Sequence, residues 1–209
     1  MNLEELGRRF ARLTTNAVVR RPGLWRVFRG LMRRQFDAIA PRWETMRMAD
    51  SLAPFEAGLS AMSPAPKRAL DLGTGTGAGA RAIAARFPEA EVVGADLSER
   101  MLAEARRTLP AEFADRVRFE VADASSLPYE EGAFDLVTLV NMIPFFDELE
   151  RVVAPGGQLL FAFSGGAGTP IYVPPERLRT ELGRRGFTDF AEFEAGRGTA
   201  LLARKPTRG

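Results

Sequence analysis

The 209-residue sequence contains neither cysteine nor histidine. Without cysteine the chain has no disulfide, no thiol nucleophile and no thiolate metal ligand. Without histidine it lacks the side chain that proteins use most for acid–base chemistry near neutral pH and for binding metals. These two absences argue strongly against a zinc enzyme and against a hydrolase with a Ser-His-Asp triad. We expect no metal site.

Long apolar runs are missing as well. No stretch approaches the roughly 18 apolar residues that a membrane-spanning helix needs. The first residues, MNLEELGRRFARL, lack the apolar core of a secretory signal. The sequence therefore predicts a cytoplasmic protein without a membrane span. With 45% hydrophobic and 27% charged residues it has an ordinary globular composition, and its length fits one domain with a small appended cap.

Lysine is scarce, since Lys67 and Lys205 are the only two, and arginine supplies the remaining positive charge. That charge is unevenly distributed. Residues 1–50 contain 11 arginines and 5 acidic residues, a net charge of +6, which leaves −4 for the rest of the chain. Such asymmetry can indicate contact with nucleic acid, an anionic membrane surface or an acidic substrate. A solvated, arginine-rich helix face is the simpler interpretation, and the sequence alone favours it.

Two kinds of periodicity divide the chain. Over residues 1–62 apolar residues such as Leu6, Phe10 and Leu13 recur at steps of three and four, which predicts amphipathic helices. After a proline-rich linker, short apolar runs alternate with helical periodicity, a pattern typical of βαβ units around a parallel sheet. We therefore expect an N-terminal helical cap over residues 1–62 and an α/β domain over residues 67–209.

Seven strands are expected in the α/β domain. They cover residues 68–72, 91–95, 117–121, 134–140, 158–164, 188–194 and 199–204. The first four are separated by helices or turns of suitable length for parallel connections. The turn Gly196-Arg197-Gly198 joins the last two strands as an antiparallel hairpin.

A glycine-rich bend follows the first expected strand, in Leu70-Asp71-Leu72-Gly73-Thr74-Gly75-Thr76-Gly77. Glycine lets a backbone turn tightly and approach a ligand closely, and the start of the Ala-rich helix after the bend offers free N–H groups. Taken alone the bend is ambiguous, because residues 75–80 also satisfy the relaxed dinucleotide pattern G-x-G-x-x-A. An NAD-dependent enzyme is therefore kept as a weaker alternative.

Three aspartates at strand ends favour a different ligand. Asp71 precedes the glycines, where it can pair with an ammonium group but would repel a pyrophosphate. Asp96 ends the second strand about 20 residues beyond the glycines, the distance at which a carboxylate meets a bound ribose. Asp123 ends the third strand, where it could accept a hydrogen bond from the amino group of adenine. A single aspartate at a strand end is as often a turn or helix-cap residue as a ligand-binding one. The three together predict a ligand that carries both adenosine and an amino acid moiety.

In these motifs the chain resembles the class I S-adenosylmethionine-dependent methyltransferases, in the broad group that methylates quinones and other small molecules. The similarity extends from about Phe36 to the end of the chain. It implies a Rossmann-like, doubly wound, mostly parallel seven-stranded sheet with a C-terminal antiparallel hairpin, an N-terminal helical cap, and S-adenosyl-L-methionine as cofactor.

The resemblance assigns roles within this cofactor site. The glycine bend resembles the D-x-G-x-G-x-G loop of the family, which implies that its glycines pass the methionine moiety and that Asp71 helps to bind the amino group. It also implies that Asp96 binds the ribose hydroxyls, with Leu97 against the adenine ring. The residues expected to bind the cofactor are Asp71, Gly73, Thr74, Gly75, Gly77, Asp96, Leu97, Asp123, Ala124 and Asn141.

The acceptor site is less well defined. Residues 36–43 are similar to the segment that closes over the cofactor in such enzymes, and the histidine that relatives usually have after the fourth strand is absent. Residues 141–146 also resemble, loosely, the Asn-Pro-Pro-aromatic loop of enzymes that methylate planar amide or base nitrogens. The aromatic residues that could line an acceptor pocket, or simply belong to the core, are Trp43, Phe145, Phe146 and Tyr172.

No catalytic residue is assigned. A sulfonium already activates its methyl group, so the protein mainly has to align the acceptor and exclude water. A hydroxyl acceptor would need a base, for which the nominees are Asp147, Glu148, Glu176 and Tyr172. Methyl transfer to a small organic acceptor is favoured. A nucleic-acid or protein methyltransferase that uses the basic helices, and a cofactor-binding domain without turnover, are the alternatives; the acceptor atom and the oligomeric state are not predicted.

Overall fold

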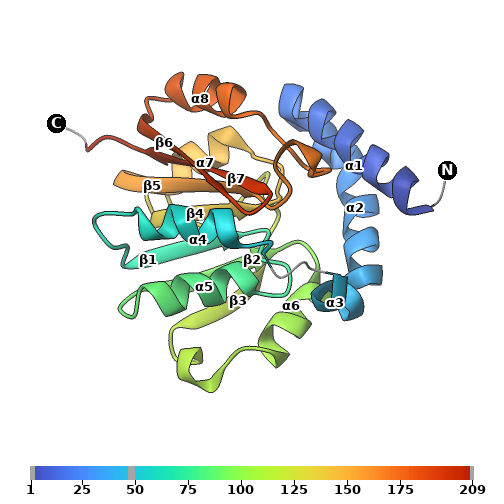
Figure 1. Ribbon diagram of the computed structural model, residues 1–209, viewed down its shortest axis with the longest axis horizontal. Helices are drawn as coiled ribbons and strands as arrows, with labels where there is room; N and C mark the ends of the chain where they lie inside the picture. The colour runs from blue at the N-terminus through green and yellow to red at the C-terminus, as the bar shows by residue number, and fades with distance from the viewer. Residues whose placement is uncertain (1–2, 47–49, 208–209) are drawn as a thin grey trace.

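The computed structural model describes residues 3–46 and 50–207. A single sheet runs through the molecule, helices flank it, and α1 (Leu3–Arg20) and α2 (Trp25–Ile39) lie together at one end (Figure 1). The expected cap and α/β domain also included residues 1–2, 47–49 and 208–209, which lie outside the described residues.

The sheet has the strand order β3-β2-β1-β4-β5-β7-β6. Its strands are β1 (Arg68–Leu72), β2 (Glu91–Asp96), β3 (Val117–Val121), β4 (Phe134–Val140), β5 (Val153–Phe163), β6 (Thr188–Ala195) and β7 (Gly198–Arg204). Strands β1 to β5 pair in parallel, whereas β7 is antiparallel to both β5 and β6. This confirms the predicted doubly wound, mostly parallel sheet with a C-terminal hairpin. Strand β5 begins earlier than predicted, because Val153 already pairs with Phe134 before a shift in register.

Helices and 3-10 turns connect the strands. The elements before β1 are α1, η1 (Pro22–Leu24), α2, η2 (Ala40–Arg42), α3 (Trp43–Met46) and α4 (Ala53–Ser60). The later ones are α5 (Ala78–Arg86), α6 (Glu99–Arg107), η3 (Ala111–Phe113), α7 (Phe146–Val152), η4 (Gly166–Gly168) and α8 (Pro175–Gly183). Prolines stand in the short turns η1 and η2 on either side of α2, since proline lacks the N–H that a helix interior needs.

Two apolar clusters fill the space between the sheet and its helices. Successive residues of β1, Ala69 and Leu70, belong to different clusters, because side chains alternate between the faces of a strand. On one face Phe55 of α4 and Ile83 of α5 are fully buried, and on the other Leu149 of α7 is. Helix α4 therefore lies on the sheet, although the sequence places it in the helical N-terminal region.

The helices α1 and α2 lie across the carboxyl ends of the parallel strands. Trp25 and Met32 of α2 are buried there, and Arg12 of α1 donates to the carbonyl oxygens of Ala167 and Thr169 at 2.6 and 3.0 Å. None of the described helices combines enough length and hydrophobicity to cross a bilayer.

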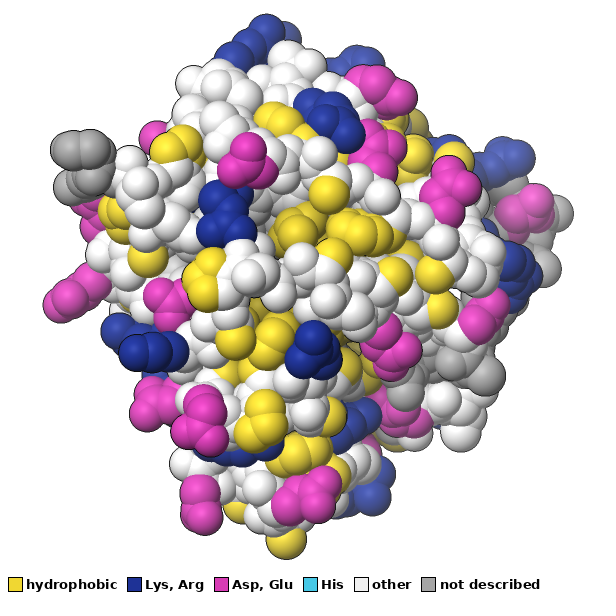
Figure 2. All heavy atoms as spheres, turned by 60° about the vertical axis from the view of Figure 1, so that its left-hand side comes forward, with side chains coloured by type: hydrophobic (Ala, Val, Ile, Leu, Met, Phe, Trp, Pro, Cys, Tyr) yellow, Lys and Arg dark blue, Asp and Glu magenta, His cyan; other side chains and the backbone are white. Residues whose placement is uncertain are grey.

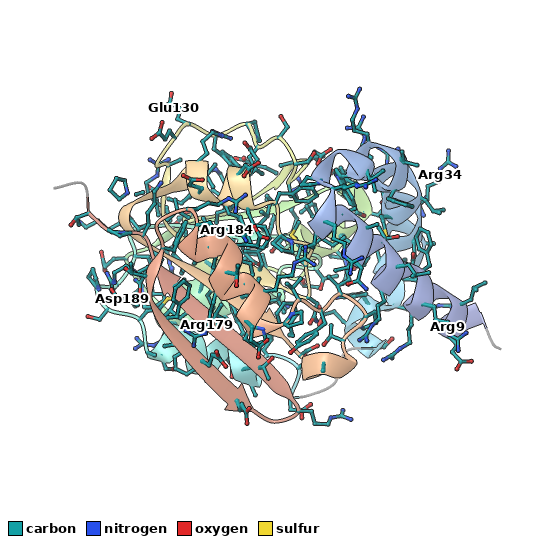
Figure 3. The ribbon with its side chains drawn as sticks, turned by 90° about the horizontal axis from the view of Figure 1, so that it is seen from above. Arg9, Arg34, Glu130, Arg179, Arg184 and Asp189 are labelled. Atoms are coloured by element: carbon teal, nitrogen blue, oxygen red, sulfur yellow. The ribbon has the colours of Figure 1, made fainter. Side chains whose placement is uncertain are left out.

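Charged side chains are spread over the surface of the molecule. Figure 2 brings forward the side that lies on the left in Figure 1, and there acidic and basic side chains are interspersed, with apolar side chains between them. Seen from above, Arg9 of α1 and Arg34 of α2 point outward at the cap end, whereas Glu130 and Asp189 lie toward the other end (Figure 3).

Candidate functional site

The glycine bend connects β1 to α5 at the carboxyl end of the sheet. Gly73, Gly75 and Gly77 have φ angles of 73°, 55° and 82°, in the left-handed region that glycine occupies without steric cost. The backbone N–H groups of Gly73 and Thr74 donate to the carbonyl of Ala95 at 2.8 and 3.0 Å. The bend is therefore tied to the neighbouring strand β2 and presents its outer side to the cap.

Asp71 lies beneath the bend. It is 2% exposed, and its carboxylate accepts hydrogen bonds from the hydroxyls of Thr74 at 2.6 Å and Thr138 at 2.8 Å. Burial raises the pKa of Asp71 above its usual value, and these two hydrogen bonds offset part of the rise. A Cβ at Gly79 would lie 2.6 Å from its Oδ2 atom, so glycine in α5 leaves room for the carboxylate. Asp71 thus holds the bend in place.

Asp96 joins the end of β2 to the same bend. Its Oδ2 atom accepts a hydrogen bond from the N–H of Gly75, and its Oδ1 atom accepts one from the N–H of Ser98, both at 2.9 Å. Burial raises the pKa of Asp96; the two N–H groups counteract the rise, and the nearby charge of Asp71 adds to it. Each carboxylate oxygen has a second lone pair. Asp96 can therefore accept further hydrogen bonds from hydroxyl groups of a ligand.

Asp123 is engaged by the cap. Its Oδ1 atom accepts hydrogen bonds from the indole Nε1 of Trp25 at 2.8 Å and from the N–H of Ser125 at 2.9 Å, and its Oδ2 atom lies 3.1 Å from Arg29. Burial alone would raise the pKa of Asp123, but the hydrogen bonds from Ser125, Trp25 and Arg29 outweigh it and lower the pKa. The carboxylate expected at the adenine edge is therefore directed to α2. No motif in the sequence signals this contact.

Further contacts, which sequence reasoning missed, hold the cap over the bend. The hydroxyl of Ser98 donates to Asp37 of α2 at 2.6 Å. The hydroxyl of Thr76 donates to Glu44 of α3, and Arg81 lies 3.9 Å from the same carboxylate. Asp37 and Glu44 lie within or next to residues 36–43, whose likeness to a closing segment is the only sequence signal for these contacts.

Asn141 turns the chain out of β4. Its φ angle is 51°, in the left-handed region that asparagine tolerates better than most residues. Its side-chain oxygen accepts a hydrogen bond from the N–H of Ser164, and its Nδ2 donates to the hydroxyl of Ser164, both at 2.9 Å. Asn141 therefore links the carboxyl ends of β4 and β5.

A cavity of about 760 Å³ lies between these strand ends and the cap. The expected cofactor residues that line it are Asp71, Gly73, Thr74, Gly75, Asp96, Leu97, Ala124 and Asn141. Gly77 and Asp123 are not in its wall. Gly77 instead caps α5, where a Cβ would lie 2.9 Å from the ring of Phe119. The cavity falls within the range of about 300–1,000 Å³ that is typical of cofactor and small-molecule sites.

The aromatic residues nominated for an acceptor pocket lie in different places. Trp43 and Phe145 line the cavity, and Trp43 meets Phe36 edge to face with ring centroids 6.0 Å apart. Phe146 is outside the wall of this cavity, with the guanidinium of Arg185 over its ring at 5.3 Å. Tyr172 is also outside and packs edge-on against Phe163. The structure thus brings two of the four to the cavity.

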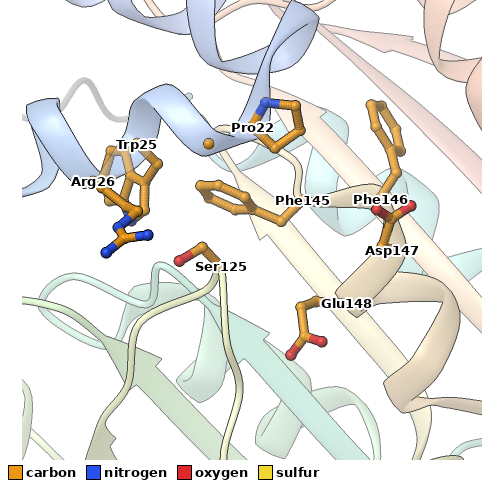
Figure 4. A pocket seen from close by; sticks show the side chains of 9 residues that line it. Pro22, Trp25, Arg26, Ser125, Phe145, Phe146, Asp147 and Glu148 are labelled. Carbon is orange, nitrogen blue, oxygen red and sulfur yellow. The ribbon is translucent and has the colours of Figure 1, made fainter.

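A second cavity, of about 230 Å³, has Trp25, Phe145 and Glu148 among the residues that line it (Figure 4). Trp25 and Phe145 line both cavities, and their rings meet edge to face with centroids 5.5 Å apart. These two side chains therefore form a partition between the two spaces.

The nominated bases lie outside the large cavity. Asp147 and Glu148 line only the smaller one; Asp147 is 2.6 Å from Arg185, and Glu148 is 2.7 Å from Arg151. The hydrogen bond from Arg151 lowers the pKa of Glu148, and burial raises the pKa of Tyr172. Glu176 and Tyr172 line neither cavity. Within residues 3–46 and 50–207, the acidic side chains in the wall of the large cavity are Asp71 and Asp96.

A known protein family matches the part of the chain that contains the glycine bend, Asp96 and Asn141. Residues 69–157 match a family model described as a methyltransferase domain. The chain is 44% identical over 140 residues to a demethylmenaquinone methyltransferase of Thermus thermophilus, covering 60% of this chain and 62% of the relative. It is 36% identical over 152 residues to a malonyl-[acyl-carrier protein] O-methyltransferase of Halorhodospira halophila, covering 66% and 49%. The chain thus spans less than two thirds of the length of these relatives.

Solved structures share the fold. A SAM-dependent methyltransferase from Aquifex aeolicus superposes with a TM-score of 0.63 over 79% of this chain and 97% of that one, at 16% sequence identity. At such low identity the likeness establishes the fold alone.

Proposed function

We propose, from the premise that this chain belongs to the class I S-adenosylmethionine-dependent methyltransferases, that it binds S-adenosyl-L-methionine in the large cavity and transfers the methyl group to a small organic acceptor. One observation carries the proposal: the glycine bend, Asp96 and Asn141, which lie at the carboxyl ends of three different strands, line a single cavity beneath the cap. S-adenosylmethionine supplies a methyl group that its sulfonium already activates.

The cavity fits this cofactor in shape and in charge. A Cβ at Gly75 would project toward Trp43, still 3.8 Å from its Nε1 atom, so the bend leaves open space on its cavity side. Leu97 and Ala124 offer apolar surface for a flat ring. Asp71 and Asp96 place negative charge in the wall beside the glycine bend, which favours a cationic group there, while Arg8 of α1 and Arg33 of α2 line the cavity on the cap side.

We assign a role to each part of the wall. Asp96 would accept hydrogen bonds from the ribose hydroxyls through the lone pairs that Gly75 and Ser98 leave free. The backbone of the bend would pass the methionine moiety, and Asp71 would favour its ammonium group mainly through charge, because its side chain is buried beneath the bend. Leu97 and Ala124 would contact the adenine ring. Asp123 would reach it only after breaking its contacts with Trp25 and Arg29 of α2.

The acceptor would bind beside Trp43 and Phe145, which line the cavity next to the bend. The two relatives are named for different acceptors, demethylmenaquinone and malonyl-[acyl-carrier protein]. The similarity therefore supports a class of small organic acceptors and does not single out one. Both acids of the wall serve the cofactor in this proposal, so an acceptor that needs no protein base is favoured. A cytoplasmic location and a division into a cap over residues 1–62, of which α4 packs on the sheet, and a methyltransferase domain over residues 67–209 complete the proposal.

Calorimetric titration with S-adenosylmethionine, S-adenosylhomocysteine and NAD tests the choice of cofactor. We expect one molecule of either sulfur compound to bind per chain and NAD not to bind. Binding of NAD alone would contradict the proposal.

A panel of quinols, phenols, carboxylic acids and amines then tests the acceptor class, with S-adenosylhomocysteine detected by mass spectrometry. We expect turnover with at least one of these small molecules. Cofactor binding without any turnover would identify a binding domain, and turnover with nucleic acid or protein alone would replace the small acceptor.

A further inference from the structure

The cap exposes large apolar side chains on its outer side. Leu13 is 69% exposed and Val27 is 73% exposed. Among the described residues, every exposed large apolar side chain except Val121 lies on α1, η1 or α2, and these are Leu6, Leu13, Leu24, Val27 and Leu31. Scattered single residues of this kind are normal on a surface, whereas a concentration on one pair of helices is the pattern expected of an interaction surface.

On each helix these side chains share one side. Along α1, Leu6 and Leu13 are seven residues apart, and along η1 and α2, Leu24, Val27 and Leu31 follow at steps of three and four. Residues at such spacing lie on the same side of a helix. The two helices touch through Phe10 and Phe28, whose ring centroids are 6.2 Å apart, which joins the two stripes.

The opposite side of the same helices faces the large cavity. Ala11 of α1 and Met32 of α2 are buried and line the large cavity. Both residues lie on the other side of their helices from Leu13 and Val27. The apolar stripes consequently point away from the rest of the described chain, so that only something outside it can cover them.

Arginines stand within the same stripes. Arg9 and Arg20 continue the stripe of α1, at three and fourteen residues from Leu6, and Arg34 continues that of α2, three residues after Leu31. Figure 3 shows Arg9 and Arg34 pointing outward at this end of the molecule. Within residues 3–46 and 50–207 no ion pair involves these three arginines. The first 50 residues carry a net charge of +6.

We propose that the surface of an anionic lipid bilayer covers this face, which we call the cap outer face: Leu6, Leu13, Leu24, Val27 and Leu31, with Arg9, Arg20 and Arg34. Helices that lie on membranes combine apolar side chains, which enter the boundary of the hydrocarbon, with arginines that contact anionic headgroups. The cap outer face supplies both in one place. This inference goes beyond the proposed function and does not depend on it.

Other partners fit the cap outer face less well. Nucleic acid would match the arginines but offers no apolar phase for Leu13, Val27 and Leu31. A second copy of the chain in a two-fold dimer would cover the apolar side chains, but it would set the same arginine-bearing surface against itself. A bilayer that contains anionic lipid satisfies the apolar and the charged groups together.

Co-sedimentation with vesicles tests the proposal. The protein is mixed with vesicles of phosphatidylcholine alone, or of phosphatidylcholine and phosphatidylglycerol in equal amounts, at low and at high salt. We expect binding to the anionic vesicles, weaker binding at high salt because salt screens the arginines, and little binding to the neutral ones.

Two pairs of substitutions separate the apolar from the charged contribution. Val27→Ser with Leu31→Ser should weaken binding to the anionic vesicles by about tenfold or more. Arg9→Gln with Arg34→Gln should weaken it by about fivefold for each arginine. The matched controls are Val121→Ser, at the exposed apolar residue outside the cap, and Arg100→Gln, at an exposed arginine of α6. Both controls should bind as the unaltered protein does.

Thermal unfolding followed by circular dichroism shows whether each variant is folded, and all the altered residues are exposed. Binding that neither pair of substitutions weakens, in folded variants, would overturn the proposal. The absence of vesicle binding would also overturn the proposal. A dimer that Leu31→Ser dissociates would then identify a second copy of the chain as the partner. Binding of a nucleic acid through Arg9 and Arg34 would identify nucleic acid instead.

Discussion

The indole N–H of Trp25 donates a hydrogen bond to the carboxylate of Asp123 at 2.8 Å and so joins α2 to the chain just after β3. Arg29, one turn further along α2, contacts the other oxygen at 3.1 Å. A strand-end aspartate therefore anchors the cap in addition to the apolar packing of Trp25 and Met32. The position of the cap over the cavity is tied to the edge of the sheet.

The Trp25–Asp123 hydrogen bond should make the two side chains energetically coupled. Trp25→Phe keeps an aromatic ring but removes the donor, and Asp123→Ala removes the acceptor. In a double-mutant cycle measured by urea unfolding, we expect the coupling to be about 0.5–1.5 kcal/mol, the usual net contribution of one hydrogen bond. Effects that add within a few tenths of a kcal/mol would show that the contact does not stabilise the fold.

The pH dependence of stability provides a second test of Asp123. Its pKa is lowered in the folded protein, because hydrogen bonds outweigh the effect of burial. An acid of this kind stabilises the fold at pH values above its ordinary pKa of 3.8, and the contribution is lost as the pH falls through the folded pKa. The difference in free energy of unfolding between the unaltered protein and Asp123→Asn should thus shrink on acidification. Asp71 and Asp96 titrate in both proteins, so the difference isolates Asp123.

Gly75 should be essential for binding S-adenosylmethionine. A side chain at this residue would point into the cavity toward Trp43, and the φ angle of 55° disfavours any residue with a Cβ. We expect Gly75→Val to abolish binding in calorimetry and to lower the free energy of unfolding by about 1–2 kcal/mol through backbone strain. Gly75→Ala carries similar strain with a smaller side chain, so it should retain part of the binding. Equal and normal binding by both variants would place the ligand elsewhere.

Asp96 should contribute to cofactor affinity without being needed for folding. Asp96→Ala should weaken S-adenosylmethionine by about 1–3 kcal/mol, because hydrogen bonds to a charged group are lost. Glu89→Ala removes an acidic residue from the exposed turn before β2 and serves as the matched control. An unchanged dissociation constant for Asp96→Ala would contradict the proposed ribose contact.

Local patterns in the sequence were sufficient to predict the sheet. Alternating apolar runs, glycine turns and the spacing of helices depend on residues close together in the chain, and they located all seven strands, the parallel core and the final hairpin. They also indicated the bend at residues 73–77 and the strand-end aspartates. The early start of β5 escaped notice because Val153 follows α7 directly, with no intervening turn.

Contacts between distant residues could not be predicted. Asp71, Asp96 and Asp123 look alike in the sequence, each at the end of a strand, yet Asp71 is covered by Thr138, 67 residues away, and Asp123 by Trp25, 98 residues away. What distinguishes the three is their partners, which are determined by how the cap and β4 pack. The roles of all three in binding a cofactor remain predictions.

The contact between Asp37 and Ser98 should control how quickly a bound cofactor leaves. Asp37 lies near the end of α2, Ser98 follows β2, and the 2.6 Å hydrogen bond between them holds the cap beside Asp96. Asp37→Ala removes this contact with a charged group, and we expect the dissociation rate of S-adenosylmethionine to rise by about tenfold or more. Trp25 and Trp43, the two tryptophans of the sequence, both line the cavity, so that stopped-flow fluorescence can follow release.

The association rate separates two explanations for such an effect. If the cap only retains the cofactor, Asp37→Ala changes dissociation and leaves association nearly constant. If the cap must open before the cofactor enters, both rates rise and the dissociation constant changes little, since an altered barrier affects the two directions alike. Glu99→Ala removes the exposed acid next to Ser98 and should change neither rate. Unchanged rates in Asp37→Ala would mean that the cap holds its position without this contact, through the anchor at Asp123 and the bond between Thr76 and Glu44.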